Sequence, residues 1–246
     1  MSGYIGIDGL DTGPTLVMVH GAGANRKMWL PEIECLSDRY RIVTLDLPGH
    51  GARMDEKYDY FRSVASVEDA IEEHTTGPVI LVGLSLGGYV AMAARHPRIA
   101  GLVLSGSTIA YTGWGGFSTK LYGMALAPFT RFVRKANEKA LRKALPPEMA
   151  DEFIAHGQSQ KSATRALRTM PGHDFRAMLS EVECPVLILN GERDKGNREE
   201  EDDAAAVARD ATIVMVEDSG HACSITQPEA FSESIHAFCT TRALTT

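Results

Sequence analysis

One stretch decides the fold: residues 79–97, which read VILVGLSLGGYVAMAARHP. It opens with a continuous apolar run of the kind that is buried on both faces of a parallel sheet. The run ends in Gly83-Leu84-Ser85-Leu86-Gly87, and a helical pattern follows over 87–97. This strand, tight turn and helix would hold Ser85 exposed, with glycines beside it because a Cβ would clash in so sharp a bend. A serine hydroxyl held in this way becomes a nucleophile when a base takes its proton, so Ser85 is the candidate nucleophile.

Similar apolar runs recur along the chain and predict the rest of a sheet. They cover residues 15–21, 41–47, 101–107 and 185–191, and a more alternating run at 212–218 suits a position nearer a sheet edge. Helical patterns lie between them, such as the charged stretch 199–209. Strands that alternate with helices predict an α/β fold with a mostly parallel, doubly wound sheet that carries helices on both faces.

One region interrupts this alternation. Residues 108–180 contain helical patterns, the longest at 121–145, but no convincing strand. We expect a helical cap or lid over 108–180, inserted into a core formed by residues 1–107 and 181–246. Residues 111–180 hold eleven Lys and Arg against five Asp and Glu, a net charge of +6. The whole chain carries −7, which argues against nucleic acid as a partner.

Five short motifs follow the predicted strands in a fixed order. They are His20-Gly21-Ala22-Gly23, Asp46-Leu47-Pro48-Gly49-His50-Gly51, the Ser85 turn, Gly191-Glu192-Arg193-Asp194 and Ser219-Gly220-His221. Together they resemble the α/β-hydrolase superfamily over nearly the whole chain. The resemblance implies a sheet of usually eight strands with a helical cap. Only 13 residues precede Pro14, so the usual N-terminal strand pair would shrink to one strand around 3–7, leaving about seven strands.

The base needs a pKa near neutrality, which points to a histidine. His20 and His50 lie in the two glycine-rich turns, where the superfamily uses them structurally. Five others, His74, His96, His156, His173 and His236, fall in or near helical patterns, which favours surface or packing roles. His221 instead follows the last predicted strand in a short polar loop. We therefore predict that His221 is the catalytic base.

The acid that orients the imidazole should also lie at a strand end. Asp194 closes the run PVLILNGERD, with Glu192 and Asp218 as rivals. The resemblance and the chain order serine, aspartate, histidine favour Asp194. The loop 195–201 departs from the family, because it is highly charged where related enzymes often have a short hydrophobic or proline-containing turn. A loop of different composition could shift Asp194 away from the place that the family gives to the acid.

Acyl transfer also needs N–H donors for a developing oxyanion. The residue after the nucleophile supplies one, the backbone N–H of Leu86. By resemblance the second comes from the turn after the first long strand, from Ala22 or alternatively from Gly23. This chemistry requires no metal and no cofactor.

These residues predict hydrolysis of a small carboxylic ester or lactone through an acyl-serine. A thioesterase, a carbon–carbon bond hydrolase or lyase, and a non-catalytic ligand-binding protein remain alternatives, since a fold does not fix a reaction. Serine at the turn disfavours dehalogenase and epoxide-hydrolase chemistry, whose relatives carry aspartate there. The basic cap either attracts a carboxylate- or phosphate-bearing substrate or is a solvated helix face. The apolar cap residues either line an acyl pocket or only pack the cap; they are Trp114, Phe117, Leu121, Met124 and Phe129.

The remaining features predict no other class. The four cysteines have neither CxxC nor zinc-ligand spacing, which disfavours disulfide and metal frameworks. The N-terminus lacks the basic start and apolar run of a signal peptide, and no apolar run is long enough for a membrane span. We expect a cytoplasmic protein whose partner is a small-molecule substrate. The sequence does not indicate an oligomeric state.

Overall fold

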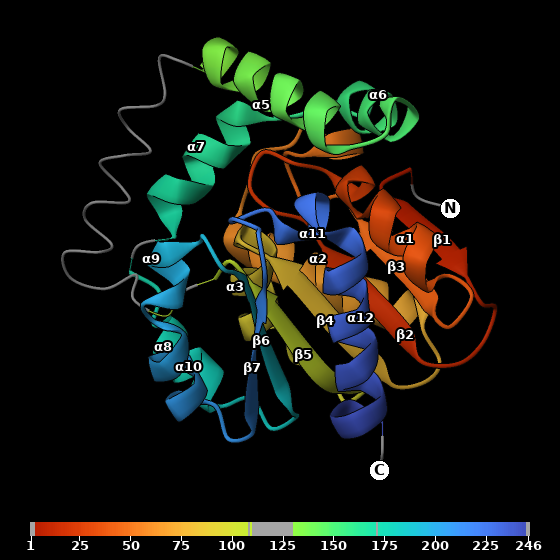
Figure 1. The fold of residues 1–246 in the computed structure, drawn as a ribbon, viewed down its shortest axis with the longest axis vertical. Coiled ribbons are helices and arrows are strands. Elements are labelled where there is room, and N and C mark those ends of the chain that lie inside the picture. The colour runs from red at the N-terminus through yellow and green to blue at the C-terminus, as the bar shows by residue number, and fades with distance from the viewer. Residues whose placement is uncertain (1–2, 108, 110–129, 171, 245–246) are drawn as a thin grey trace.

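A seven-stranded sheet forms the centre of the computed structural model, which describes residues 3–107, 109, 130–170 and 172–244. The strands lie in the order β1-β3-β2-β4-β5-β6-β7 (Figure 1). β1 is antiparallel to β3, and the other neighbouring pairs are parallel. The strands are β1 (Ile5–Gly9), β2 (Thr15–Val19), β3 (Arg41–Leu45), β4 (Val79–Leu84), β5 (Ile99–Ser105), β6 (Val186–Gly191) and β7 (Ala211–Val216).

The sheet confirms the predicted fold class and its number of strands. β7 lies at the edge, as its alternating pattern predicted. It leaves Ile213 and Met215 more than a third exposed, because an edge strand is covered less completely than a central one. The first strand begins at Ile5, two residues later than predicted. Its position is set by pairing along the whole of β3, from Ile5 opposite Leu45 to Gly9 opposite Arg41.

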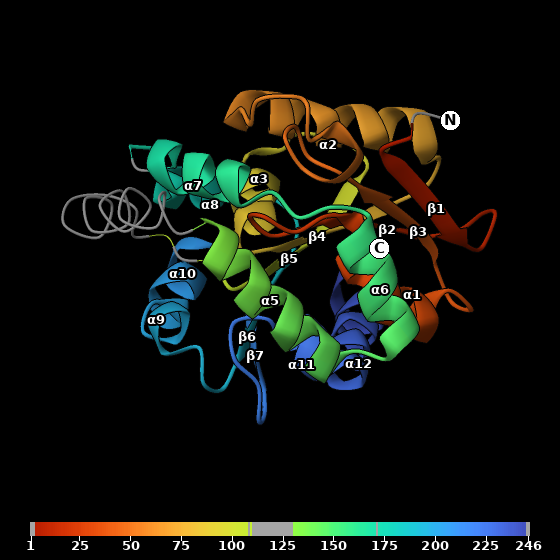
Figure 2. The same cartoon turned by 90° about the horizontal axis from the view of Figure 1, so that it is seen from above.

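Helices cover both faces of the sheet (Figure 2). Successive strand residues point to opposite faces. Leu16 and Met18 therefore pack with α1 and α12, whereas Val17 and Val19 pack with α2, α3, α8 and α10. These helices are α1 (Leu30–Leu36), α2 (Tyr60–His74), α3 (Leu86–Ala93), α8 (Phe175–Ser180), α10 (Glu201–Val207) and α12 (Pro228–Phe238).

Two helices are shorter than their sequence patterns. The helix predicted over 87–97 is α3, which ends at Ala93 because Ala94 is extended, with ψ 138°. Pro97 also disfavours helical backbone at His96, so the helix could not continue to residue 97 as predicted. The helix predicted over 199–209 is α10, which ends at Val207 because Ala208 is likewise extended, with ψ 142°.

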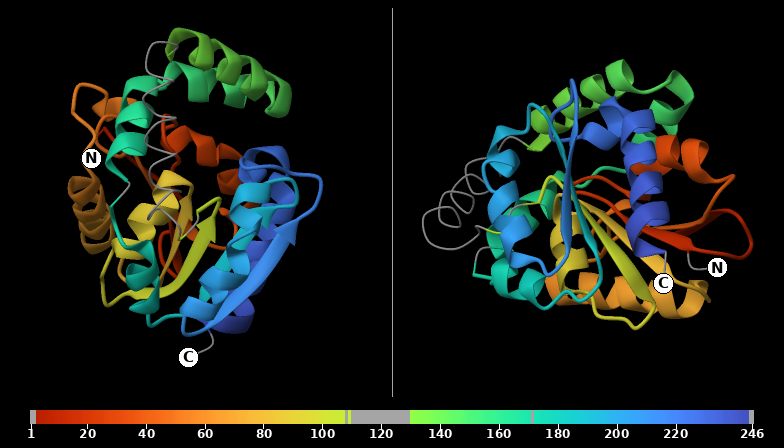
Figure 3. Two further views of the ribbon diagram at one scale, coloured as in Figure 1. Left: turned by 90° about the vertical axis from the view of Figure 1, so that its left-hand side faces the viewer. Right: turned by 60° about the horizontal axis from the view of Figure 1, so that its bottom comes forward.

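Between β5 and β6 the described chain is helical. Helices α5 (Thr130–Ala144), α6 (Pro147–Ala155) and α7 (Gln160–Thr169) precede α8. Figure 3 shows α5, drawn in green, across one end of the sheet. Leu141 and Phe153 pack into the same buried cluster as Leu16 and Met18 of the sheet. The described helices agree with the helical pattern of 108–180, while the division into core and cap stays a prediction.

Among the residues described, no helix combines the length and the apolar character that crossing a bilayer requires.

Candidate active site

Ser85 lies at the tight turn between β4 and α3. Its φ is 53° and its ψ is −114°, a left-handed conformation that a residue with a side chain rarely adopts. Its backbone N–H donates to Ser105 O at 2.7 Å, which fixes the turn to the neighbouring strand β5. A Cβ on Gly83 would lie 2.4 Å from the Gly87 carbonyl carbon, and one on Gly87 would lie 2.0 Å from Val19 O. The prediction that the turn needs both glycines is confirmed.

His221 and Asp194 meet beyond the ends of β7 and β6. His221 Nδ1 donates to Asp194 Oδ2 at 2.8 Å. Asn197 Nδ2 donates to the same oxygen at 2.8 Å. Burial acts to raise the pKa of Asp194, but the hydrogen bond and charge of His221 and the Asn197 hydrogen bond together lower it. A carboxylate that stays charged in this position can orient the imidazole and stabilise its cation.

The rival acids are directed elsewhere. Glu192 Oε2 accepts the backbone N–H of Asp218 at 3.0 Å, and Asp218 pairs with Arg193. The charged loop after Asp194 forms the short helix α9 (Lys195–Arg198), which supplies Asn197. The departure from the family pattern therefore leaves Asp194 beside His221. The sequence did not single out Asn197, since a lone Asn in a charged loop carries no signal of its own.

Gly106 makes room for the His221 ring. It has φ 59°, and a Cβ there would lie 2.7 Å from His221 Cε1. Its N–H donates to Asn190 Oδ1 at 2.9 Å, so the backbone beneath the imidazole is fixed. Gly106 was not among the predicted site residues, although a glycine directly after an apolar strand run is a usable signal.

We expect Gly106→Ala to lower kcat about a hundredfold. The added Cβ would push the His221 ring away from its position, and a displacement of about 1 Å is enough for a loss of this size. Gly196→Ala is the matched control: a Cβ there meets nothing within 4 Å. Steady-state kinetics on p-nitrophenyl butyrate measure both variants. Full activity of Gly106→Ala would show that the position of this ring does not limit the reaction.

Ser85 and His221 line one pocket of about 370 Å³. The turn Gly21–Ala24 and the α5 residues Leu141 and Ala144 line it as well. Gly21 lies against the Ser85 turn, since a Cβ on Gly21 would be 3.6 Å from Ser85 Cβ. The structure therefore brings the predicted nucleophile, base and glycine-rich turn together, with Asp194 behind the base.

Both predicted oxyanion donors lie beside this pocket. Leu86 opens helix α3 and Ala22 belongs to the turn that lines the pocket. Within the described parts of the chain, neither backbone N–H has a protein acceptor. Both are thus free to donate to a ligand, and the positive end of a helix dipole adds to the effect at Leu86. Their role in the reaction stays a prediction.

His20 and His50 are buried and shape the site from behind. His20 Nε2 accepts the backbone N–H of Leu47 at 3.1 Å, and its Nδ1 bonds to Gly21 O at 2.8 Å. Burial lowers the pKa of His20, and burial together with the nearby His20 lowers the pKa of His50 to about 3. Two neutral, buried rings fit a structural role and exclude both as solvent-exposed bases.

These two rings predict loss of stability in acid. Folded His50 stays neutral down to about pH 3, whereas its ordinary pKa is 6.5. Between those values the unfolded chain binds more protons, so the free energy of unfolding falls as the pH falls, by up to about 1.4 kcal/mol per pH unit. Urea unfolding between pH 7 and pH 4 measures this slope. We expect His50→Asn to flatten it, and equal slopes in both proteins would refute the assignment to His50.

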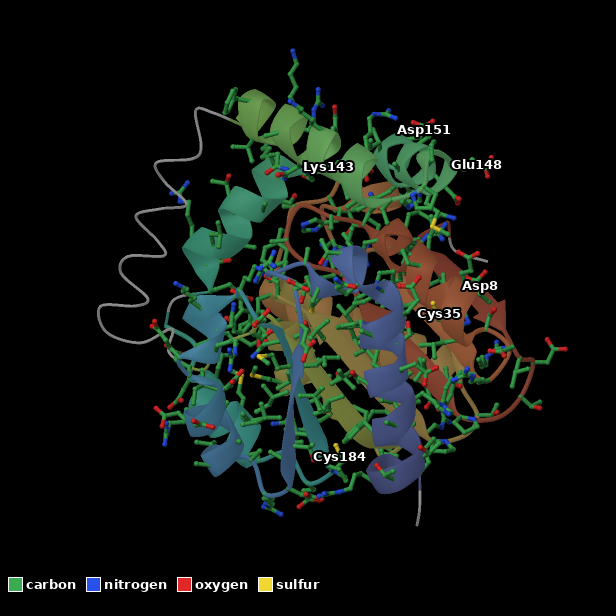
Figure 4. The ribbon with its side chains drawn as sticks, in the orientation of Figure 1. Asp8, Cys35, Lys143, Glu148, Asp151 and Cys184 are labelled. Carbon is green, nitrogen blue, oxygen red and sulfur yellow. The ribbon has the colours of Figure 1, made fainter. Side chains whose placement is uncertain are left out.

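The remaining reactive groups lie outside the pocket. Cys35, Cys184, Cys223 and Cys239 are free thiols. Cys184 lies at the end of the sheet opposite helices α5 and α6 (Figure 4). In the described residues no group of three or more His, Cys, Asp or Glu side chains could hold a metal ion. The five apolar cap residues named from the sequence, between 114 and 129, lie outside the described residues.

Comparison with known proteins decides the family. Residues 16–234 match the profile of the alpha/beta hydrolase family. The chain belongs to this family. It is 30% identical over 207 residues to a pimeloyl-[acyl-carrier protein] methyl ester esterase of Nitrosomonas europaea, covering 77% of this chain and 81% of that protein.

Solved structures agree on the fold of this α/β hydrolase. MenH from S. aureus aligns with a TM-score of 0.79 at 22% identity, over 97% of this chain and 98% of that one. A thermophilic esterase from Thermogutta terrifontis aligns with a TM-score of 0.75 at 25% identity, over 96% and 92% of the two chains. With these relatives, the predicted membership of the superfamily is confirmed, and the chain is an enzyme of the esterase type.

Proposed function

We propose that this α/β hydrolase cleaves a small carboxylic ester through an acyl-serine intermediate, with Ser85, His221 and Asp194 as its catalytic triad. One observation carries the proposal: His221, hydrogen-bonded to Asp194, lines the same pocket as Ser85. The left-handed backbone of Ser85 supports it further, since such strain is found where a side chain must be held out for chemistry.

The reaction follows from this arrangement. Ser85 Oγ attacks the ester carbonyl carbon while His221 Nε2 takes the hydroxyl proton, because Nδ1 is engaged by Asp194. The N–H groups of Leu86 and Ala22 stabilise the oxyanion. As the tetrahedral intermediate collapses, the carbon–oxygen bond breaks and His221 gives its proton to the departing alcohol. Water, deprotonated by His221, then attacks the acyl-serine, and the carboxylic acid leaves with Ser85 restored.

A second candidate is cleavage of a thioester, or of an ester on an acyl group that a phosphorylated carrier holds. Helix α5 favours it: Thr130–Ala144 holds six Lys and Arg against one Glu, and Ala140 and Ala144 line the pocket. Lys143, labelled beside α5 in Figure 4, is one of the exposed lysines of this helix. The Nitrosomonas europaea relative is named for a substrate bound to an acyl-carrier protein. A positive surface beside the pocket would attract such a carrier.

A substrate panel tests the proposal and separates these reactions. Ethyl valerate, δ-valerolactone and valeryl-coenzyme A present a five-carbon acyl chain as an open ester, as a cyclic ester whose alcohol stays attached to the chain, and as a thioester. We expect the ester to be turned over and a fluorophosphonate to label Ser85. Preference for the thioester would favour the second candidate. A protein that turns over none of the three and is not labelled would be a ligand-binding member of the family.

A further inference from the structure

Gln158 is a polar residue that the proposed reaction leaves unused. It lies between α6 and α7 and lines the pocket that holds Ser85 and His221. Its side-chain amide nitrogen Nε2 is buried and has no hydrogen-bond partner in the described part of the chain. A buried donor without a partner costs about 1–3 kcal/mol. Because Nε2 is not accessible in this structure, the cost is recovered when the side chain turns its amide toward the pocket and a ligand there supplies the acceptor.

The segment around Gln158 is fixed to the core on both sides. Before it, His156 Nε2 bonds to Asp46 Oδ2 at 2.7 Å, and Asn25 Nδ2 donates to Gly157 O at 2.7 Å. After it, Ser159 N donates to Gly23 O at 3.1 Å. Gln158 is therefore held beside the glycine-rich turn that carries the predicted oxyanion donor Ala22.

The anchor at Asp46 is itself rigid. Its side chain is fully buried and also accepts the backbone N–H groups of Arg26 at 2.8 Å and Ala52 at 3.1 Å. Farther along, Ser162 Oγ of α7 donates to Gly49 O at 2.7 Å. These contacts fix the backbone on both sides of Gln158, so only its side-chain torsions have to be ordered when the amide forms a hydrogen bond with a ligand.

The apolar lining of the rest of the pocket means that the Gln158 amide would distinguish an acyl chain with an oxygen acceptor from a purely alkyl chain. The described lining is mostly apolar, with Met28, Leu84, Leu141 and Ile225 as its large members. A volume of about 370 Å³ suits a small acyl chain. An alkyl chain would satisfy the apolar walls and leave the amide unpaired, whereas a chain that carries one oxygen acceptor would satisfy both.

The acyl part is the part of the substrate that needs this contact. In the reaction proposed above the alcohol departs after the first step, while the acyl group stays bonded to Ser85 until water releases it. A donor on a lining residue of the Ser85 pocket can turn toward the acyl chain and act on it through both steps. We propose that Gln158 is a specificity-determining residue whose amide donates to a carbonyl or carboxylate oxygen on the acyl chain. The inference rests on the proposed function.

A series of matched esters tests this. The p-nitrophenyl esters of valeric, hexanoic and heptanoic acid are compared with esters of the same length that carry one keto oxygen, at the γ, δ and ε carbon respectively. We expect the wild-type protein to prefer one keto position about tenfold in kcat/KM, the value of one buried hydrogen bond. Gln158→Met keeps the size of the side chain without the donor, and we expect the ratio of keto to alkyl ester to fall to about one, mainly through KM.

Gln160→Met is the control, because Gln160 is the same residue type on the same segment but lies outside the pocket lining. It should keep the keto preference. If Gln158→Met does not fold, Gln158→Glu serves instead: a carboxylate faces the keto oxygen, and the ratio should fall below one. The proposal is overturned if the wild type prefers no keto position, or if the preference survives in Gln158→Met.

Failure of the proposed function would look different. The wild type would then turn over neither the keto nor the alkyl esters, and Ser85 would not react with a fluorophosphonate. Binding of the free keto and alkyl acids, followed by ligand-observed NMR, makes the same comparison without turnover. Equal binding of both acids by the wild type would overturn the role of Gln158 in that case as well.

Discussion

Replacing Ser85 by alanine will reduce kcat for p-nitrophenyl butyrate by about a millionfold, down to the residual rate that binding and the oxyanion donors alone provide. The variant keeps the turn but loses the hydroxyl that forms the acyl-enzyme in the proposed reaction. The expected signature is a loss in kcat with little change in KM, because the hydroxyl acts in the transition state more than in ground-state binding.

The matched control is Ser234→Ala, which removes from α12 a half-buried hydroxyl that donates to Ala230 O and lies outside the lining of the Ser85 pocket. It should turn over the ester at the wild-type rate, and a fluorophosphonate should label it as it labels the wild type. A Ser85→Ala enzyme that retains more than about a tenth of the activity would remove Ser85 from the mechanism, since no residual rate from binding alone is that large.

The strands could be predicted because their sequence pattern is local. A parallel strand buried on both faces needs a continuous apolar run, and Val79–Leu84 is fully buried. The turn at Ser85 was predictable for the same reason, since its glycines are required by contacts with their own neighbours and with Val19. His221 and Asp194 could be placed at one sheet edge because the carboxyl ends of parallel strands lie together.

What sequence reasoning missed depends on contacts between distant segments. His156 was predicted to have a surface or packing role, yet it bonds to Asp46, 110 residues away. Nothing in the helical pattern around His156 contains that information, because the partner is set by where α6 ends above β3. The same holds for Gln158, whose position in the pocket follows from the contacts of its neighbours with Asn25 and Gly23.

Asp194→Asn will lower kcat about a thousandfold or more and leave the fold intact. An amide at this position can turn its NH₂ group toward His221, which then holds the imidazole in the tautomer that cannot accept the Ser85 proton. The charge that would stabilise the imidazolium is lost as well. Because its contacts lower the pKa of Asp194 below that of an ordinary aspartate, the carboxylate is charged at neutral pH, and this loss should persist across the neutral range. Steady-state kinetics from pH 6 to pH 9 measure it.

Glu192→Gln and Asp218→Asn are the controls that decide between the three acids. Both change a carboxylate to an amide in the loops that carry Asp194 and His221, but Glu192 accepts the backbone N–H of Asp218, and Asp218 pairs with Arg193. Asn tolerates the positive φ of 53° at position 218, so this change adds no backbone strain. We expect both controls to stay within about threefold of the wild type, because neither removes the contact at His221 Nδ1. A loss in either control that equals the loss in Asp194→Asn would mean that the imidazole exchanges acids during turnover, and the hydrogen bond between His221 and Asp194 would then describe only the resting enzyme.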